Sequence, residues 1–249
     1  METEKIVTAC VLVIGNEILS GRTQDVNLNY LAKGLNKAGV RLREARVIPD
    51  VAEAIVAAVN EVRGKFDYIF TTGGIGPTHD DITAECVARA FGVPLVLDPD
   101  ARRILEARYR PGELNEARLR MAHVPKGASL VTNPISGAPG FRIGNVFVLA
   151  GVPQIMQAMF DGVAGSLRGG RPMLARTVTS GLPEGVLAKG LAQIQERYGD
   201  IDIGSYPWYR AGAFGTSLVL RGTDENRLGA AAAEVAALVK VLGGTPQEE

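Results

Sequence analysis

The sequence predicts an α/β fold, with a doubly wound domain over residues 1–170 and a small α+β domain over residues 171–249. Strand and helix patterns alternate three times between residues 6 and 91, which is typical of a parallel sheet covered by helices. The first apolar run lacks polar alternation, as expected of a strand that is buried on both faces. The Gly-Gly-Arg-Pro sequence at residues 169–172 has the composition of a linker.

The composition is that of a globular protein. With 249 residues, 46% of them hydrophobic and 22% charged, the chain can bury a full core. Its 27 Lys and Arg residues balance its 27 Asp and Glu residues, so no bulk basic field favours a nucleic-acid partner, and we expect none. The N-terminus is short and acidic, unlike a signal peptide, and no apolar run approaches the ~20 residues of a membrane span. We therefore expect no membrane contact and a cytoplasmic location.

The two cysteines and two histidines do not predict a metal centre. Cys10 and Cys86 are far apart, one in a predicted strand and one in a predicted helix, so we interpret them as buried free thiols. His79 and His123 are too distant in the sequence to suggest a zinc site. His79 is a candidate ligand contact, whereas we expect His123 to be a packing or surface residue.

Residues 6–14 form the first predicted strand, which is rich in β-branched residues. A polar loop with two glycines and two acids follows at residues 15–25. Because open α/β sheets bind ligands at the carboxyl ends of their strands, this loop is a candidate binding segment. Asp25 has the position of an N-cap for a helix that runs through Leu35 and ends near Gly39.

Asp50 follows the second predicted strand, which lies within residues 40–48. With Glu53 three residues later, Asp50 fits a capping box at the start of the next helix. Asp50 also lies at the carboxyl end of its strand, the edge that carries Glu17 and Asp81 if the sheet is parallel. Both interpretations, helix cap and site residue, remain open from the sequence.

The central motif is TTGGIGPTHDD at residues 71–81, between an apolar run at 66–70 and a helical pattern at 82–91. Its three glycines allow the backbone to approach a ligand closely, and the amides at the start of the following helix favour an anion, which suggests phosphate. Asp80 and Asp81 would repel a phosphate unless a hard cation lay between them. The motif thus predicts a phosphorylated ligand with a divalent metal. The alternative is a tight turn in which Asp81 caps the helix, and Asp81 can do both.

The later segments are less specific. Residues 98–110 and 113–121 are predicted helices with six arginines and three glutamates, which we interpret as a solvated or intersubunit surface rather than a phosphate clamp. Loops at 133–141 and 150–153, rich in Gly, Pro and small residues, are either connecting turns or the rim of a pocket. Pro153 fits the first position of a helix.

The second domain has a β-α-β-β-α pattern. The first predicted strand ends at Val178, and two more lie near residues 201–206 and 216–220. The predicted helices cover residues 183–197 and 225–242. Tyr206, Trp208, Tyr209 and Phe214 collect around the predicted hairpin. Aromatic side chains can stack on bases, but no Gly-x-x-Gly loop with basic flanks occurs, so packing or dimer contact is the preferred interpretation. We expect residues 243–249 to fray.

The motifs at residues 15–21 (GNEILSG), 71–81 and 150–153 (AGVP) resemble, in order, those of the molybdopterin-binding domain family. The resemblance covers about residues 1–170. It is closest to the branch typified by the N-terminal part of competence/damage-inducible protein A and by the corresponding domain of eukaryotic FAD synthase. It implies a three-layer α/β/α fold with a mostly parallel central sheet. The layout of the second domain resembles the KH-type unit of the competence protein.

The resemblance also implies a function. In this branch it implies a metal-dependent pyrophosphatase for dinucleotide-like compounds such as ADP-ribose or FAD, with Mg²⁺, Mn²⁺ or Co²⁺. The alternative is a molybdopterin-binding protein or adenylyltransferase of molybdenum cofactor biosynthesis, with molybdopterin as ligand and no hydrolase activity. The family's functional aspartates correspond to Asp50 and Asp81, and Glu17 corresponds to a pocket residue. A homo-oligomer, as a dimer, is the implied assembly.

The expected site follows from the motifs and this resemblance together. The predicted catalytic residues are Glu17, Asp50 and Asp81, and the predicted metal ligands are Asp80 and Asp81. The predicted residues that bind the nucleotide or pterin ligand are Gly15, Asn16, Gly73, Gly74, Gly76, Pro77, Thr78 and Gly137. Either Asp50 or Glu17 orients the attacking water in this scheme.

Two departures from the family pattern affect these expectations. Ala150 stands where the family commonly has Pro, which changes the rim of the pocket but removes no charge. The bacterial competence protein continues into an amidase-type domain, and this chain stops before it could hold one, so we expect no deamidase activity.

Overall fold

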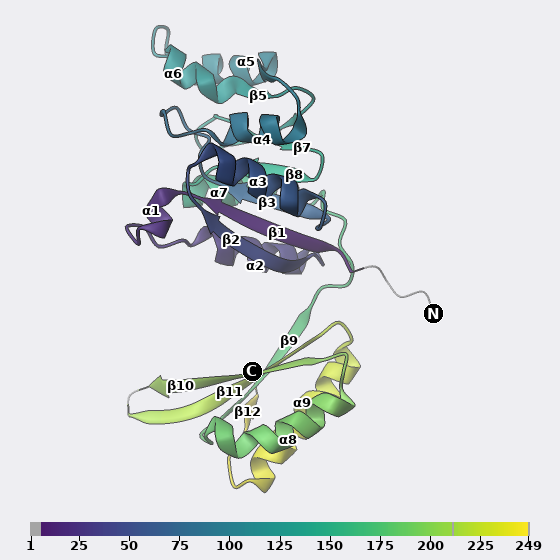
Figure 1. Ribbon diagram of the computed structural model, residues 1–249. Coiled ribbons are helices and arrows are strands. Elements are labelled where there is room, and N and C mark those ends of the chain that lie inside the picture. The colour runs from purple at the N-terminus through teal and green to yellow at the C-terminus, as the bar shows by residue number, and fades with distance from the viewer. Residues whose placement is uncertain (1–5, 211, 249) are drawn as a thin grey trace. The chain divides into compact units, whose positions relative to one another are not determined.

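The computed structural model describes residues 6–210 and 212–248. The chain divides into two compact units, Met1–Gly170 and Arg171–Glu249 (Figure 1). Each unit has its own sheet and its own buried core.

A six-stranded sheet forms the centre of the first unit, with the strand order β2-β1-β3-β8-β7-β6. Its strands are β1 (Thr8–Ile14), β2 (Arg41–Ile48), β3 (Tyr68–Thr72), β6 (Ser129–Val131), β7 (Gly140–Ile143) and β8 (Val146–Leu149). The pairs β1–β2, β1–β3 and β3–β8 are parallel, whereas β7 pairs antiparallel with both β6 and β8. The predicted α/β class with a mostly parallel central sheet is confirmed.

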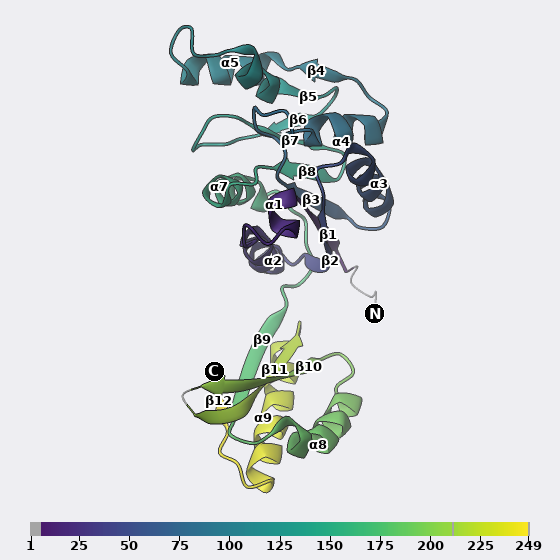
Figure 2. The same cartoon turned by 60° about the vertical axis from the view of Figure 1, so that its left-hand side comes forward.

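Helices cover both faces of this sheet (Figure 2). On one face lie α2 (Asn27–Lys37) and α7 (Pro153–Ala164), and on the other lie α3 (Ala52–Arg63) and α4 (Thr83–Phe91). Side chains of β1 alternate between these two cores: Cys10, Leu12 and Ile14 pack on the α3 and α4 side, and Ala9, Val11 and Val13 on the α2 and α7 side. Burial on both faces explains the continuous apolar run, and the three-layer arrangement is confirmed.

Aromatic rings fill the core beneath α2 and α7. Phe70 stacks on Phe147 with ring centroids 5.0 Å apart and meets Phe160 edge-on at 5.6 Å. Gly34 of α2 leaves space for the third ring, because a Cβ at this position would lie 2.2 Å from Cε1 of Phe160. The glycine lets helix α2 approach α7 closely.

A small excursion lies between α4 and the antiparallel part of the sheet. It contains β4 (Leu95–Leu97), α5 (Pro99–Arg108), α6 (Glu116–Leu119), a 3₁₀ turn (Arg120–Ala122) and β5 (His123–Pro125). Strands β4 and β5 pair with each other, and Ala101, Leu105 and Ala122 form a separate small core. The predicted helix over residues 113–121 is therefore only one turn of α-helix followed by a 3₁₀ turn.

Of the two interpretations left open for Asp50 and for Asp81, the helix-cap alternative is not borne out. The N-cap residues of α3 and α4 are Val51 and Ile82, and neither makes a side-chain capping bond. Asp25 does accept a hydrogen bond from the amide of Leu28 at 2.9 Å, at the start of α2. The carboxylates of Asp50 and Asp81 accept hydrogen bonds from Asn16 and Thr78 instead, in the site described below.

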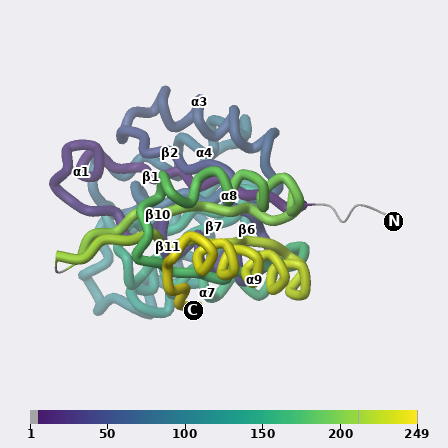
Figure 3. Tube along the Cα trace, turned by 90° about the horizontal axis from the view of Figure 1, so that it is seen from below, coloured from purple at the N-terminus to yellow at the C-terminus, as the bar shows by residue number. Residues whose placement is uncertain are grey.

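The second unit contains a four-stranded antiparallel sheet in the order β10-β11-β9-β12. Its elements are β9 (Leu174–Ser180), α8 (Glu184–Arg197), β10 (Asp202–Arg210), β11 (Ala213–Gly222), α9 (Glu225–Val241) and β12 (Gln247–Glu248). Helices α8 and α9 lie side by side (Figure 3) and share one core with the sheet. The predicted β-α-β-β-α order is present.

Two details of the second unit differ from expectation. The hairpin strands extend to Arg210 and from Ala213, so the aromatic side chains lie within paired strands, with Trp208 opposite Gly215. The tail is not wholly frayed, because Gln247 and Glu248 pair with Thr179 and Val178 of β9. A polar segment of only two residues has no sequence pattern that predicts pairing at the edge of a sheet.

Both thiols are free and buried, as predicted. Burial raises the pKa of Cys10 to about 12 and that of Cys86 to about 11, which keeps both in the unreactive thiol form. Among the described residues, every helix is too short or too polar to cross a bilayer.

The close approach of α2 and α7 predicts opposite effects for two helical Gly→Ala changes. Gly162 of α7 is exposed with nothing within 4 Å of its added Cβ, so Gly162→Ala should stabilise the protein by up to ~1 kcal/mol. Gly34→Ala should instead lower the free energy of unfolding by roughly 1–3 kcal/mol, because the new methyl group collides with Phe160. Urea unfolding followed by circular dichroism measures both, and a Gly34→Ala protein as stable as wild type would contradict this packing.

Candidate functional site

The carboxyl ends of the four parallel strands meet at a cavity of about 580 Å³, which we call the main cavity. Most of the residues predicted from the sequence line it, namely Glu17, Asp50, Gly73, Gly74, Gly76, Pro77, Asp80 and Asp81. They come from three different strand-to-helix loops, which only the parallel sheet brings to one edge.

The chain turns at Gly73 and Gly74, whose φ values of +102° and +67° are left-handed. A side chain at Gly73 has no space, because its Cβ would lie 2.2 Å from the carbonyl oxygen of Ile14 in β1. Thr83 of α4 holds the turn from the other side. Its amide donates to the carbonyl of Gly74 and its hydroxyl to the carbonyl of Gly73, both at 3.0 Å.

Asp81 is oriented by its own loop. Its Oδ2 accepts hydrogen bonds from both the backbone amide of Thr78, at 2.8 Å, and the Thr78 hydroxyl. Gly76 provides the space for this carboxylate, because a Cβ there would lie 2.6 Å from Oδ2 of Asp81. Gly76 therefore leaves room for the carboxylate in this position, and its φ is not left-handed.

Glu17 is accommodated in the same way. It lies in α1 (Asn16–Leu19), the single helical turn that follows β1. A Cβ at Gly15 would lie 2.5 Å from both carboxylate oxygens of Glu17, so the side chain folds back over the glycine. Two glycines of the two predicted motifs thus each leave room for a carboxylate at the main cavity.

Asp50 connects two of the loops. Its Oδ2 accepts a hydrogen bond from the backbone amide of Asn16 at 2.8 Å. This contact joins the end of β2 to α1, and both Asp50 and Glu17 of α1 line the cavity. A charged acceptor bonded to an amide is held more firmly than one bonded to water alone.

The main cavity has an unbalanced charge. Glu17, Asp50, Asp80 and Asp81 line it, and its lining includes no Lys, Arg or His. Hydrogen bonding to Thr78, aided by the backbone amide of Asp80 and by His79, lowers the pKa of Asp80 below its ordinary value. The Thr78 hydroxyl has one proton, so Asp80 and Asp81 compete for it. An anionic ligand would need a cation to enter this cavity.

The same residues fit a divalent metal that is shared with a ligand. Among the described residues, no group of three His, Cys, Asp or Glu side chains is arranged to hold a metal unaided. Mg²⁺-type ions commonly bind through one or two carboxylates together with substrate phosphates. Adjacent Asp80 and Asp81 supply oxygen donors of this type at the cavity.

The remaining predicted binding residues play different parts. Thr78 positions Asp81, Asn16 holds Asp50 and Gly15 accommodates Glu17, but none of these three lines the main cavity. The amide of Gly73 donates to the carbonyl of Leu149 at 3.2 Å, so it is engaged within the sheet. Gly137, with φ of +85°, lies in the adjacent loop without lining the cavity.

Several lining residues were not found by sequence reasoning. Asn133 and Ser136 come from the loop for which the sequence predicts either a pocket rim or a connecting turn. Asn133 organises that loop by donating to Ser136 Oγ at 2.6 Å and to the carbonyl of Ala138 at 2.8 Å. Tyr109 and Met121 come from the arginine-rich excursion, which we interpreted as surface. No local pattern distinguishes these residues from ordinary packing positions.

Comparison with known proteins agrees with this architecture. Residues 10–174 match the family described as probable molybdopterin binding domain, and residues 172–242 match the FAD synthase middle domain. A CinA-like protein of Citrifermentans bemidjiense is 44% identical over 157 residues, which cover 61% of this chain and 38% of that protein. A probable FAD synthase of Caenorhabditis elegans is 33% identical over 264 aligned positions, covering 95% of this chain and 50% of that protein.

A solved structure shows the same fold. The crystal structure of the protein CinA from Thermoplasma acidophilum has 33% sequence identity and a TM-score of 0.62, and the match covers 65% of this chain and 98% of that one. This chain spans half or less of the length of the CinA-like and FAD synthase relatives above. The family match extends over more than half of the chain and includes all the carboxylates of the main cavity. The chain belongs to the molybdopterin-binding domain family.

Proposed function

We propose that the first unit is a metal-dependent pyrophosphatase that cleaves the diphosphate of a dinucleotide-like substrate, of the ADP-ribose or FAD class. The observation that carries this proposal is the main cavity itself, where four carboxylates and a glycine turn meet without any basic side chain. A diphosphate can approach such a cavity only together with a cation. The metal therefore binds together with the substrate, held by the carboxylates of the cavity and by the diphosphate oxygens.

Asp80 and Asp81 would hold the metal, which is Mg²⁺, Mn²⁺ or Co²⁺. When bound, the metal supplies Lewis-acid stabilisation of the charge that develops on the phosphate oxygens. Thr78 keeps the Asp81 carboxylate in place through its amide and hydroxyl. The carboxylate pair thus has one member that is fixed by its loop, Asp81, and a neighbour, Asp80, whose pKa is lowered by hydrogen bonding to Thr78.

The remaining groups of the cavity bind the substrate and handle the proton. The amides of Gly74 and Gly76 face phosphate oxygens in this scheme. Water attacks one phosphorus atom, the bridging P–O bond breaks, and the second phosphate leaves as a monophosphate. The proton released by the water passes to Asp50 or Glu17, the two carboxylates that are joined through Asn16 and α1.

The second candidate is a molybdopterin-binding protein or adenylyltransferase of molybdenum cofactor biosynthesis. The observation that favours it is the match of residues 10–174 to a probable molybdopterin binding domain. In that case the main cavity holds the pterin and no dinucleotide is cleaved. Native mass spectrometry of the purified protein separates the two, since a retained pterin identifies the binder.

The proposal also covers the location and the assembly of the protein. On the family resemblance, the chain acts in the cytoplasm as a homo-oligomer, specifically a dimer. Light scattering coupled to size-exclusion chromatography measures the subunit number directly.

Removal of single carboxylates tests the reaction. Asp81→Asn keeps an acceptor for Thr78 but removes the charge, so we expect kcat/KM for ADP-ribose or FAD to fall by at least ~100-fold while the Tm stays near wild type. Asp202→Asn, an exposed change in the second unit, is the matched control and should leave the rate unchanged.

Chelation with EDTA should abolish nucleotide monophosphate release, and added Mn²⁺ should restore it. Near-normal hydrolysis by folded Asp81→Asn protein would refute the proposed role.

The glycine that accommodates Asp81 gives an independent test. Gly76→Ala should displace the Asp81 carboxylate, because the new Cβ would lie 2.6 Å from Oδ2, and should lower kcat/KM by roughly tenfold or more. Gly64→Ala is the control, since its Cβ meets nothing within 4 Å and its φ is −90°. Steady-state kinetics compare the two, and equal activity would show that Asp81 need not occupy this position.

A further inference from the structure

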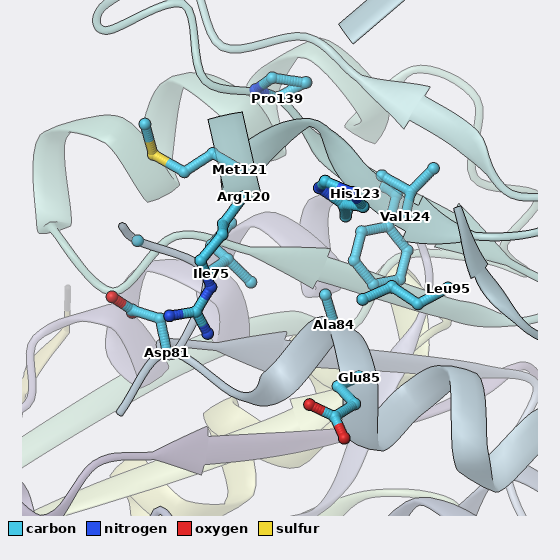
Figure 4. A pocket seen from close by; sticks show the side chains of 12 residues that line it. Ile75, Asp81, Ala84, Glu85, Leu95, Arg120, Met121, His123, Val124 and Pro139 are labelled. Atoms are coloured by element: carbon cyan, nitrogen blue, oxygen red, sulfur yellow. The ribbon is translucent and has the colours of Figure 1, made fainter. Parts of the chain in front are cut away.

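A second, smaller cavity of about 200 Å³ lies beside the main cavity, and we call it the side cavity (Figure 4). The two cavities share Ile75, Gly76, Asp81 and Met121 in their linings. The residue proposed to hold the metal therefore lies at the junction of two separate spaces. The mechanism above uses only the main cavity.

The walls of the side cavity are mostly apolar. Ala84 of α4, Leu95 of β4, Val124 of β5 and Phe141 of β7 line it, and Val124 and Phe141 are buried residues. Glu85 of α4 adds a carboxylate to the lining (Figure 4). At about 30 Å³ for each water, the space corresponds to on the order of seven water molecules. Such a volume suits one ring system and is too small for a whole dinucleotide.

His123 gives this apolar space a polar edge. Its Nδ1 lies 3.3 Å from the carbonyl oxygen of Leu119, and because a carbonyl only accepts, we assign the proton of the neutral ring to Nδ1. In the neutral ring, Nε2 is then an acceptor, and the ring lies in the side cavity next to Val124 (Figure 4). An acceptor at the edge of an apolar slot can recognise an N–H group of a heterocycle.

Arg120 provides the positive charge that the main cavity lacks. It lines the side cavity with its guanidinium directed toward the Asp81 side (Figure 4). Within the described part of the chain, it has no ion-pair partner. A phosphate at the junction would thus meet carboxylates and a metal on one side and an arginine on the other.

We propose that the side cavity binds the aromatic base of a nucleotide whose diphosphate lies at the junction near Gly76 and Asp81. The other half of the substrate then occupies the main cavity. This inference rests on the proposed function and deepens it, because it assigns the two halves of the substrate to two cavities. It also makes a nucleobase, rather than a sugar phosphate alone, the group that determines affinity.

Filling the side cavity tests the assignment. Ala84→Leu places a larger side chain in the slot while keeping good helix propensity, and Ala57→Leu on the exposed face of α3 is the matched control. Calorimetry with the full chain and Mn²⁺ measures Kd for AMP, which has a base, and for ribose 5-phosphate, which has none. We expect Ala84→Leu to weaken AMP at least tenfold and ribose 5-phosphate less than twofold, with Ala57→Leu unchanged for both.

Each outcome bears on the assignment. Equal AMP affinity in wild type and Ala84→Leu, equal loss for both probes, or no saturable AMP binding by wild type would overturn it. If Ala84→Leu does not fold, His123→Ala carries the same test, with a selective loss for AMP expected. The reaction is judged separately: wild type that cleaves dinucleotides while Ala84→Leu keeps its KM refutes only the side cavity. Wild type that binds AMP selectively but cleaves nothing refutes only the pyrophosphatase.

Discussion

The tight turn at Gly73 and Gly74 is the constraint on which the site depends. Both residues adopt left-handed backbone angles, and Gly73 lies against the carbonyl of Ile14 with no space for a side chain. On its other side a Cβ at Gly151 would lie only 3.2 Å from Cα of Gly73. The ends of β1, β3 and β8 are therefore packed backbone to backbone, and the loops that follow them must open onto one space.

Around this turn, glycines accommodate carboxylates. Gly15 leaves room for Glu17 and Gly76 leaves room for Asp81, so each acidic side chain folds over the glycine of its own motif. Asp50 reaches the same space from β2 by accepting from the amide of Asn16. Holding these acids at one cavity without a basic lining residue is unfavourable by itself, since like charges repel. Partial exposure to solvent reduces the repulsion, and a bound cation would remove it.

The excursion between α4 and β6 gives the site its second half. Its β4–β5 pair and the 3₁₀ turn after α6 bring Arg120, Met121 and His123 beside the glycine turn. In the sequence this segment has the composition of a charged surface, and its small core of Ala101, Leu105 and Ala122 gives little signal. Its position beside Asp81 is set by the packing of β4 and β5 against α4, which no local pattern encodes.

The α/β class, the alternating strands and helices up to Phe91, and the glycine and acidic motifs can all be predicted from the sequence, because they depend on local periodicity and on turn chemistry. It could not decide between cap and site for Asp50 and Asp81, since both roles use the same residue type at the same strand end. The fold answers this question: the parallel pairing of β1 and β2 places Asp50 beside Asn16, and the conformation of the glycine loop places Asp81 beside Thr78 and Gly76. Tyr109 and His123 likewise became part of a cavity only through long-range packing, which sequence spacing does not record.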